Sequence, residues 1–89
     1  MKTVSIINYG MGNIGSVENA ISTLNFKSKT ISNPEDLDNA EKIILPGVGS
    51  FKTGMKLLND GGWVSKLKNN VIIKKKPLFG ICLGMQFIA

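Results

Sequence analysis

Four short β-prone runs alternate along this 89-residue chain with segments whose apolar residues recur at helical spacing. Such alternation predicts an α/β fold in which parallel strands form one sheet and helices cover both of its faces. The run at residues 43–45 is entirely Ile and Leu, which suits a strand that is buried on both faces. The predicted strands are Val4–Ile7, Lys27–Ile31, Ile43–Leu45 and Leu78–Ile81.

The segments between these strands carry helix signals. Ile14, Val17, Ile21 and Leu24 recur at helical spacing and predict one apolar helix face. Asn33 followed by Pro34 is typical of a capped helix start. Before the last strand, two further helices are predicted from Phe51, Met55 and Leu58 and, beyond a Gly-Gly pair, from Trp63, Leu67 and Val71. Residues from Leu83 onward predict the first turns of a last helix.

The charge of the chain argues against a nucleic-acid partner. Its net charge is +5, but all eleven basic residues are lysines, and they are scattered apart from Lys74–Lys76. Arginine, which makes bidentate contacts with phosphates, is absent from the sequence. Lys74–Lys76 therefore predicts a solvated helix end, where cations complement the helix dipole.

The apolar residues and the single cysteine bear on location. No apolar run is long enough for a membrane span, and the N-terminal one is too short for a signal peptide. Cys82 is the one cysteine, so no internal disulfide can form. This fits a reducing, cytoplasmic location.

A glycine-containing turn follows the first strand. Gly10, Gly12 and Gly15 satisfy the pattern G-x-G-x-x-G, which in dinucleotide-binding folds lets the backbone approach a pyrophosphate. Those folds also place an acidic residue at the end of the second strand. Here Glu35 and Asp36 come only after Pro34. A nucleotide-binding module and a plain tight turn therefore both remain open.

The second such turn is Pro46-Gly47-Val48-Gly49, which breaks the third predicted strand. Its two glycines allow unusual backbone dihedrals, so that N–H groups can point into a cleft. N–H groups placed in that way stabilise an oxyanion without a charged side chain. A plain turn is the alternative.

The third turn carries Cys82, framed by Gly80 and Gly84. A lone cysteine among apolar residues is commonly an inert core residue. Here, however, it ends a predicted parallel strand, where ligands bind in open α/β sheets. It also directly precedes a predicted helix, whose N-terminus lowers the pKa of a thiol. Cys82 is thus predicted to be a nucleophile, with the N–H of Leu83 placed to join an oxyanion hole.

Taken together, the three turns carry a family resemblance. The segments are NYGMGNI at residues 8–14, LPGVGSF at 45–51 and GICLGMQ at 80–86. In this order and spacing they resemble class I (triad) glutamine amidotransferases, and most closely the glutaminase subunits of imidazole glycerol phosphate synthases. The resemblance spans the whole chain and implies a flavodoxin-like domain that hydrolyses glutamine to glutamate and ammonia.

The resemblance also implies roles for individual residues. Cys82 would attack the side-chain amide of glutamine and form a thioester, while the backbone of Leu83 and of the Val48–Gly49 segment holds the oxyanion. Gly49 and Gln86 would contact the bound glutamine. The Pro-Gly-Val-Gly strand reorients in this family before the oxyanion hole forms. No cofactor or metal is implied. The ammonia would pass to a (β/α)₈-barrel cyclase subunit.

Two departures from the family pattern stand out. Asn8 occupies a position where many relatives have aspartate, so a branch that feeds sugar amidotransferases in surface-polysaccharide synthesis remains an alternative. The family's catalytic histidine and glutamate lie far downstream, and this chain has no histidine. Residues 1–89 are therefore expected to be the N-terminal part of one domain about twice as long, and to be inactive alone.

Overall fold

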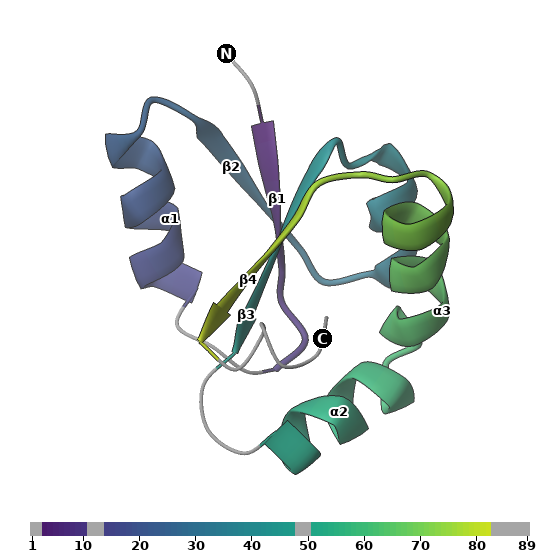
Figure 1. Ribbon diagram of the computed structural model, residues 1–89. Helices are drawn as coiled ribbons and strands as arrows, with labels where there is room; N and C mark the ends of the chain where they lie inside the picture. Colours follow the sequence, from purple (N-terminus) through teal and green to yellow (C-terminus); the bar gives the residue numbers. More distant parts are fainter. Residues whose placement is uncertain (1–2, 11–13, 48–50, 83–89) are drawn as a thin grey trace.

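The computed structural model describes residues 3–10, 14–47 and 51–82, and for Phe51 and residues 79–82 it describes the backbone only. These residues form a four-stranded sheet flanked by helices on both sides (Figure 1). The strands are β1 (Thr3–Ile7), β2 (Lys27–Ile31), β3 (Lys42–Gly47) and β4 (Leu78–Cys82). All four predicted strands are thereby confirmed.

The sheet is parallel throughout, in the order β2-β1-β3-β4. This order matches that of flavodoxin-like folds, so the predicted fold class is confirmed. In the register, Ile6 lies between Thr30 of β2 and Ile44 of β3. Because every strand runs the same way, all their carboxyl ends meet at one edge of the sheet.

The helical elements differ from the prediction in type more than in position. They are α1 (Ile14–Thr23), η1 (Pro34–Asn39), α2 (Phe51–Asp60), α3 (Trp63–Leu67) and η2 (Lys68–Ile73). Asn33 caps η1 as predicted, since its side chain accepts a hydrogen bond from the N–H of Glu35 at 3.1 Å. However, η1 is a 3₁₀ helix, and α3 continues as the π-helical η2.

A Schellman-type turn ends α1. Asn25 adopts a left-handed conformation, with φ of 62°. The N–H of Asn25 donates to the carbonyl of Ser22, and the N–H of Phe26 donates to that of Ile21. Asparagine tolerates this conformation better than most residues, so the chain can stop the helix here and enter β2.

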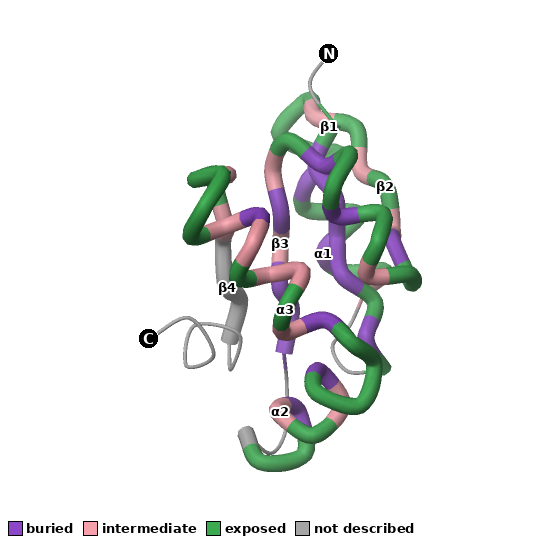
Figure 2. The backbone as a smooth tube through the Cα atoms, turned by 90° about the vertical axis from the view of Figure 1, so that its right-hand side faces the viewer, coloured by how far each residue is buried: buried purple, intermediate pink, exposed green. Residues whose placement is uncertain are grey.

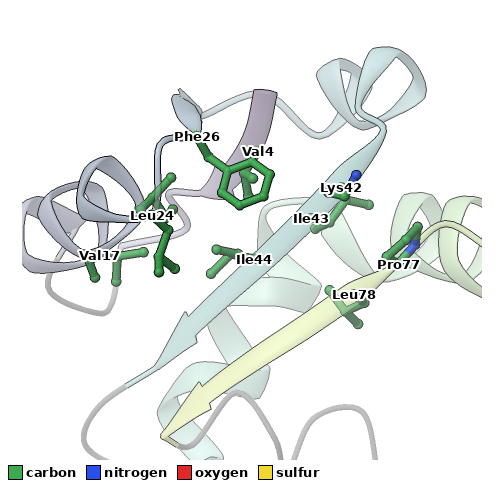
Figure 3. A pocket seen from close by; sticks show the side chains of 11 residues that line it. Val4, Val17, Leu24, Phe26, Lys42, Ile43, Ile44, Pro77 and Leu78 are labelled. Carbon is green, nitrogen blue, oxygen red and sulfur yellow. The ribbon is translucent and has the colours of Figure 1, made fainter. Parts of the chain in front are cut away.

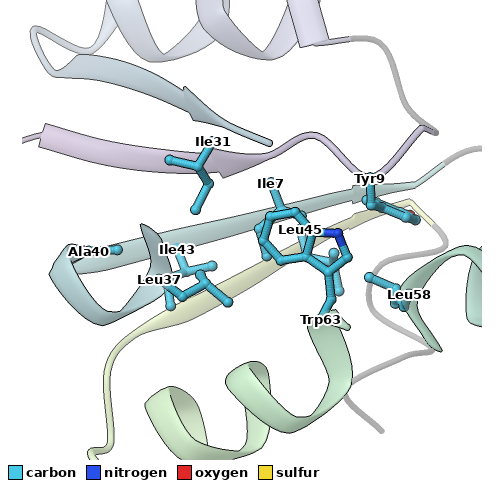
Figure 4. Packing of buried hydrophobic residues seen from close by; sticks show 9 residues of the cluster. All are labelled: Ile7, Tyr9, Ile31, Leu37, Ala40, Ile43, Leu45, Leu58 and Trp63. Atoms are coloured by element: carbon cyan, nitrogen blue, oxygen red, sulfur yellow. The ribbon is translucent and has the colours of Figure 1, made fainter. Parts of the chain in front are cut away.

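Two apolar clusters lie on opposite faces of the sheet. On the α1 face, Val4 and Ile6 pack with Val17 and Ile21. On the other face, η1, α2 and α3 contribute to a larger cluster (Figure 4). Its members are Ile7, Tyr9, Ile31, Leu37, Ala40, Ile43, Leu45, Leu58 and Trp63. In Figure 2, β3 is buried at most of its positions, as its apolar sequence predicts.

The α1 face also carries an apolar groove of about 440 Å³, between α1 and the start of β4 (Figure 3). Val17 and Leu24 line one side of it, and Pro77 and Leu78 line the other. The residues from Leu83 onward, predicted to begin a helix, lie outside the described part of the chain. None of the helices in residues 14–47 and 51–82 combines the length and the apolar character that a membrane span requires.

Candidate functional site

The ends of β3 and β4 lie side by side at the carboxyl edge of the sheet. β3 ends at Gly47 and β4 ends at Cys82, and these two residues are paired in the parallel register. Adjacent strands lie about 4.8 Å apart, so the backbone of Cys82 runs beside that of Gly47. The prediction that Cys82 ends a parallel strand is therefore confirmed.

The remaining predicted site residues lie outside the described ranges. Val48 and Gly49 directly follow the end of β3, and Leu83 directly follows the end of β4. Gln86 lies a few residues further along. What the structure describes is the pairing of Gly47 with Cys82, the residues after which these segments follow in sequence. Their predicted roles stay predictions.

β3 extends further than its sequence predicted. Pro46 and Gly47 were expected to break the strand, yet both belong to it and pair with Ile81 and Cys82 of β4. Proline has no N–H to donate, so it suits a strand position that lacks a partner on one side. The pairing of β3 with β1 ends at Ile44, which leaves Pro46 in such a position.

Tyr9 connects the turn after β1 to the end of β3. Its hydroxyl donates a hydrogen bond to the carbonyl oxygen of Pro46 at 2.6 Å, and its side chain is only 6% exposed. Burial raises the pKa of Tyr9 above its ordinary value of 10.0, so the hydroxyl keeps its proton near neutral pH. This role of Tyr9 was not predicted from the sequence. The one available signal was its residue type, because a tyrosine hydroxyl that becomes buried needs a polar partner.

The glycines of the first turn are only partly described. Gly10 has φ of +99°, a conformation that residues with a side chain rarely adopt. Gly15 lies exposed in the first turn of α1, and Gly12 falls outside the described residues. The turn thus needs Gly10 for its backbone conformation. This agrees with the interpretation of the motif as a plain tight turn.

A cluster of polar side chains lies away from this edge, between η1 and the α3–η2 segment. The carboxylate of Asp38 accepts hydrogen bonds from Lys66 Nζ at 2.6 Å and from Asn70 Nδ2 at 3.1 Å. These two bonds hold the pKa of Asp38 below its ordinary value of 3.8. Asn70 is fully buried, and its Oδ1 has no partner among the described residues. No local pattern in the sequence predicted this cluster.

Lys76 corrects one prediction about the lysine run. Lys74 and Lys75 are exposed, as expected of a solvated end. Lys76 instead turns inward, and its Nζ donates to the carbonyl oxygens of Leu37 at 2.9 Å and Asp38 at 3.1 Å. The left-handed conformation of Lys75, with φ of 57°, accompanies this change of direction. Across the described ranges, no group of acidic, histidine or cysteine side chains is arranged to hold a metal ion.

Comparison with known proteins places this chain in a family. A family model described as glutamine amidotransferase class-I matches residues 5–89. Imidazole glycerol phosphate synthase subunit HisH 2 of Pseudomonas aeruginosa is 46% identical over 85 residues, which cover 96% of this chain and 42% of that relative. Subunit HisH 1 of Campylobacter jejuni is 49% identical over 86 residues, which cover 93% of this chain and 41% of that relative.

A solved structure agrees with the sequence relatives. It is described as the crystal structure of a glutamine amidotransferase, and the chain matches it with a TM-score of 0.82 at 26% identity. The match covers 97% of this chain and 44% of that one. The chain thus spans about two fifths of the length of the curated relatives that it matches. With its parallel sheet and its cysteine at the carboxyl edge, the chain belongs to the class-I glutamine amidotransferase family.

Proposed function

We propose that residues 1–89 are the nucleophile-bearing N-terminal part of a glutaminase domain, which supplies ammonia to a synthase partner. The observation that carries this proposal is the pairing of Cys82 with Gly47 at the carboxyl edge of the sheet. The names of the similar subunits favour imidazole glycerol phosphate synthase as the setting.

The proposed reaction begins at the thiolate of Cys82. The sulfur attacks the side-chain amide carbon of glutamine, and the carbonyl oxygen becomes an oxyanion. The N–H groups of Leu83 and of the Val48–Gly49 segment hold that oxyanion, while Gly49 and Gln86 position the substrate. The tetrahedral intermediate then breaks its C–N bond and releases ammonia as the amide nitrogen takes up a proton. Water hydrolyses the resulting thioester to glutamate and frees the thiol.

This chemistry needs a base that the 89 residues do not contain, because they include no histidine. We expect the base, a histidine oriented by a glutamate, to be encoded downstream of Ala89. The relatives support this expectation, since the chain matches only about two fifths of their length. Residues 1–89 by themselves should release no more glutamate than a Cys82→Ala variant does.

For the partner, we propose a cyclase subunit with a (β/α)₈ barrel that receives the ammonia in histidine biosynthesis. The names of the relatives support a synthase assembly, in which they are subunits. A sugar amidotransferase of surface-polysaccharide synthesis is the second candidate, and Asn8 is the residue that keeps it open. We propose a cytoplasmic location, which suits a reactive thiol that must stay reduced.

The experiment that tests this function uses the full-length product of the gene. Glutamate release from glutamine is measured for the wild type, for Cys82→Ala and for Ser65→Ala, an exposed substitution on α3 that serves as the control. We expect Cys82→Ala to fall to the uncatalysed background and Ser65→Ala to match the wild type. Glutamate release that persists in Cys82→Ala would show that the nucleophile has been misassigned.

A diazoketone analogue of glutamine gives an independent readout, because it alkylates the thiol of a glutaminase. Within residues 1–89, Cys82 is the one site available for this label. We expect one label per chain in the wild type and none at this position in Cys82→Ala. Co-purification with a barrel cyclase, as opposed to a sugar amidotransferase, separates the two candidate partners.

A further inference from the structure

The hydrogen bond between Tyr9 and Pro46 acts on the peptide unit from which the second turn departs. The Tyr9 hydroxyl lies 2.6 Å from the Pro46 carbonyl oxygen, and both residues are buried. A peptide unit is planar, so the direction of the Pro46 carbonyl also sets the direction of the Gly47 N–H. Holding the carbonyl oxygen of this unit therefore also restrains the Gly47 N–H at the end of β3.

The surroundings explain why this peptide needs an anchor. Pairing of β1 with β3 ends at Ile44, so past that point β3 is paired with β4 on one side and has no ladder partner in β1 on the other. Pro46 has no N–H with which to recruit another partner on that side. Gly47 and Gly49 are the residues least restricted in their dihedrals. Tyr9 compensates, because its ring belongs to the same apolar cluster as Leu45 and Leu58 (Figure 4).

We propose that Tyr9 is a positioning residue for the oxyanion-binding turn, and that it acts through its hydroxyl on the Pro46–Gly47 peptide. This inference rests on the proposed function, since it assigns Tyr9 to the same reaction. An oxyanion hole works because its N–H groups are oriented before charge develops. If the anchor is lost, the Pro46–Gly47 peptide at the end of β3 is less restrained, which slows the chemical step and leaves glutamine binding nearly unchanged.

The test compares two isosteric deletions of a hydroxyl group in the full-length product of the gene. Tyr9→Phe keeps the buried ring and removes the bond to Pro46. Thr23→Val is the matched control, because it removes a hydroxyl that donates to the carbonyl of Ala20 at 2.7 Å on the exposed end of α1. Rates are expressed per site titrated with the diazoketone analogue, so that a smaller folded fraction does not count as a slower enzyme.

We expect Tyr9→Phe to lower kcat about tenfold with KM within about twofold, which is the scale of one well-placed hydrogen bond. Binding of an aldehyde analogue of glutamine, which forms a tetrahedral adduct with the thiol, should weaken by about the same factor. Thr23→Val should match the wild type in both measurements. Wild-type kcat and aldehyde binding in Tyr9→Phe would overturn the inference and leave the proposed function intact.

Hydrogen exchange at the Gly47 amide separates this inference from the glutaminase proposal. We expect exchange at Gly47 to speed up in Tyr9→Phe and to stay unchanged in Thr23→Val. If the wild type releases no glutamate, the proposed function fails, and the amide measurement then decides whether Tyr9 anchors the turn. Unchanged exchange at Gly47 in Tyr9→Phe would overturn the anchoring role as well.

Discussion

The two ends of β3 are held by different means. The chain enters β3 from η1, and there Asp38 binds Lys66 of α3 and Asn70 of η2. Lys76 adds two hydrogen bonds from its Nζ to backbone carbonyls of η1. Side chains from several elements thus form hydrogen bonds that hold this end of β3, and the loss of one bond leaves the others in place.

At the other end of β3, the side chain of Tyr9 holds the backbone through its hydrogen bond to the carbonyl oxygen of Pro46. The apolar cluster reaches both ends, from Leu37 and Ala40 to Tyr9 and Leu58 (Figure 4). The entry end is therefore stabilised by several contacts that can replace one another. At the exit end, the bond from Tyr9 holds the backbone that leads to the candidate site. Substitutions at the two ends should separate loss of stability from loss of chemistry.

The largest expected effect on stability is at the entry end. Leu37 is the completely buried residue of η1, so Leu37→Ala should lower the free energy of unfolding by about 2–5 kcal/mol through lost burial and a residual cavity. Chemical denaturation of the full-length gene product measures this change. Leu24→Ala is the matched control, because Leu24 is 67% exposed and the same substitution should cost within about 0.5 kcal/mol. Equal losses at both positions would contradict this assignment of the core.

Tyr9→Phe should have the second largest effect, because it leaves the buried Pro46 carbonyl without this donor. We expect a loss of about 1–3 kcal/mol in the free energy of unfolding near neutral pH. This loss in the free energy of unfolding should also depend on pH. Since the folded-state pKa of Tyr9 is raised above 10.0, the contribution of its hydroxyl is complete below that value and is lost as the pH rises through the raised pKa.

Denaturation of the wild type and of Tyr9→Phe from neutral to strongly alkaline pH tests this dependence. The difference between the two proteins should shrink above about pH 10, where ionised Tyr9 can no longer donate. A difference that grows with pH in this range would mean that Tyr9 is more easily ionised in the folded state, against the burial seen here.

The smallest expected effect is that of Asp38→Asn. Lys66 and Asn70 lower the pKa of Asp38, so its stabilisation is complete above its ordinary value of 3.8 and is lost as the pH falls through the lowered pKa. Asp38→Asn should therefore lower Tm slightly at neutral pH and low salt, and the difference should vanish in strong acid. Asp60→Asn, an exposed change at the end of α2, is the control. A Tm difference that is insensitive to both salt and acid would argue against an electrostatic role for Asp38.

Much of the fold followed from local pattern. The four strands could be placed from β-prone runs, and Asn33 could be identified as a cap, because both signals depend on residues close together in sequence. The type of η1 and the π-helical turn of η2 could not be predicted in this way. These two elements are joined by hydrogen bonds among Asp38, Asn70 and Lys76, which lie far apart in the chain and so beyond the reach of a local pattern.

The candidate site also combines features that local sequence predicts with features that only the tertiary structure decides. The glycine frame around Cys82 and its place after a β-prone run belong to the sequence alone, since turn chemistry is local. The pairing of Cys82 with Gly47, the extension of β3 through Pro46 and the bond from Tyr9 were decided by the tertiary structure. Strand register and the partner of a buried hydroxyl depend on segments that only the packed sheet brings together.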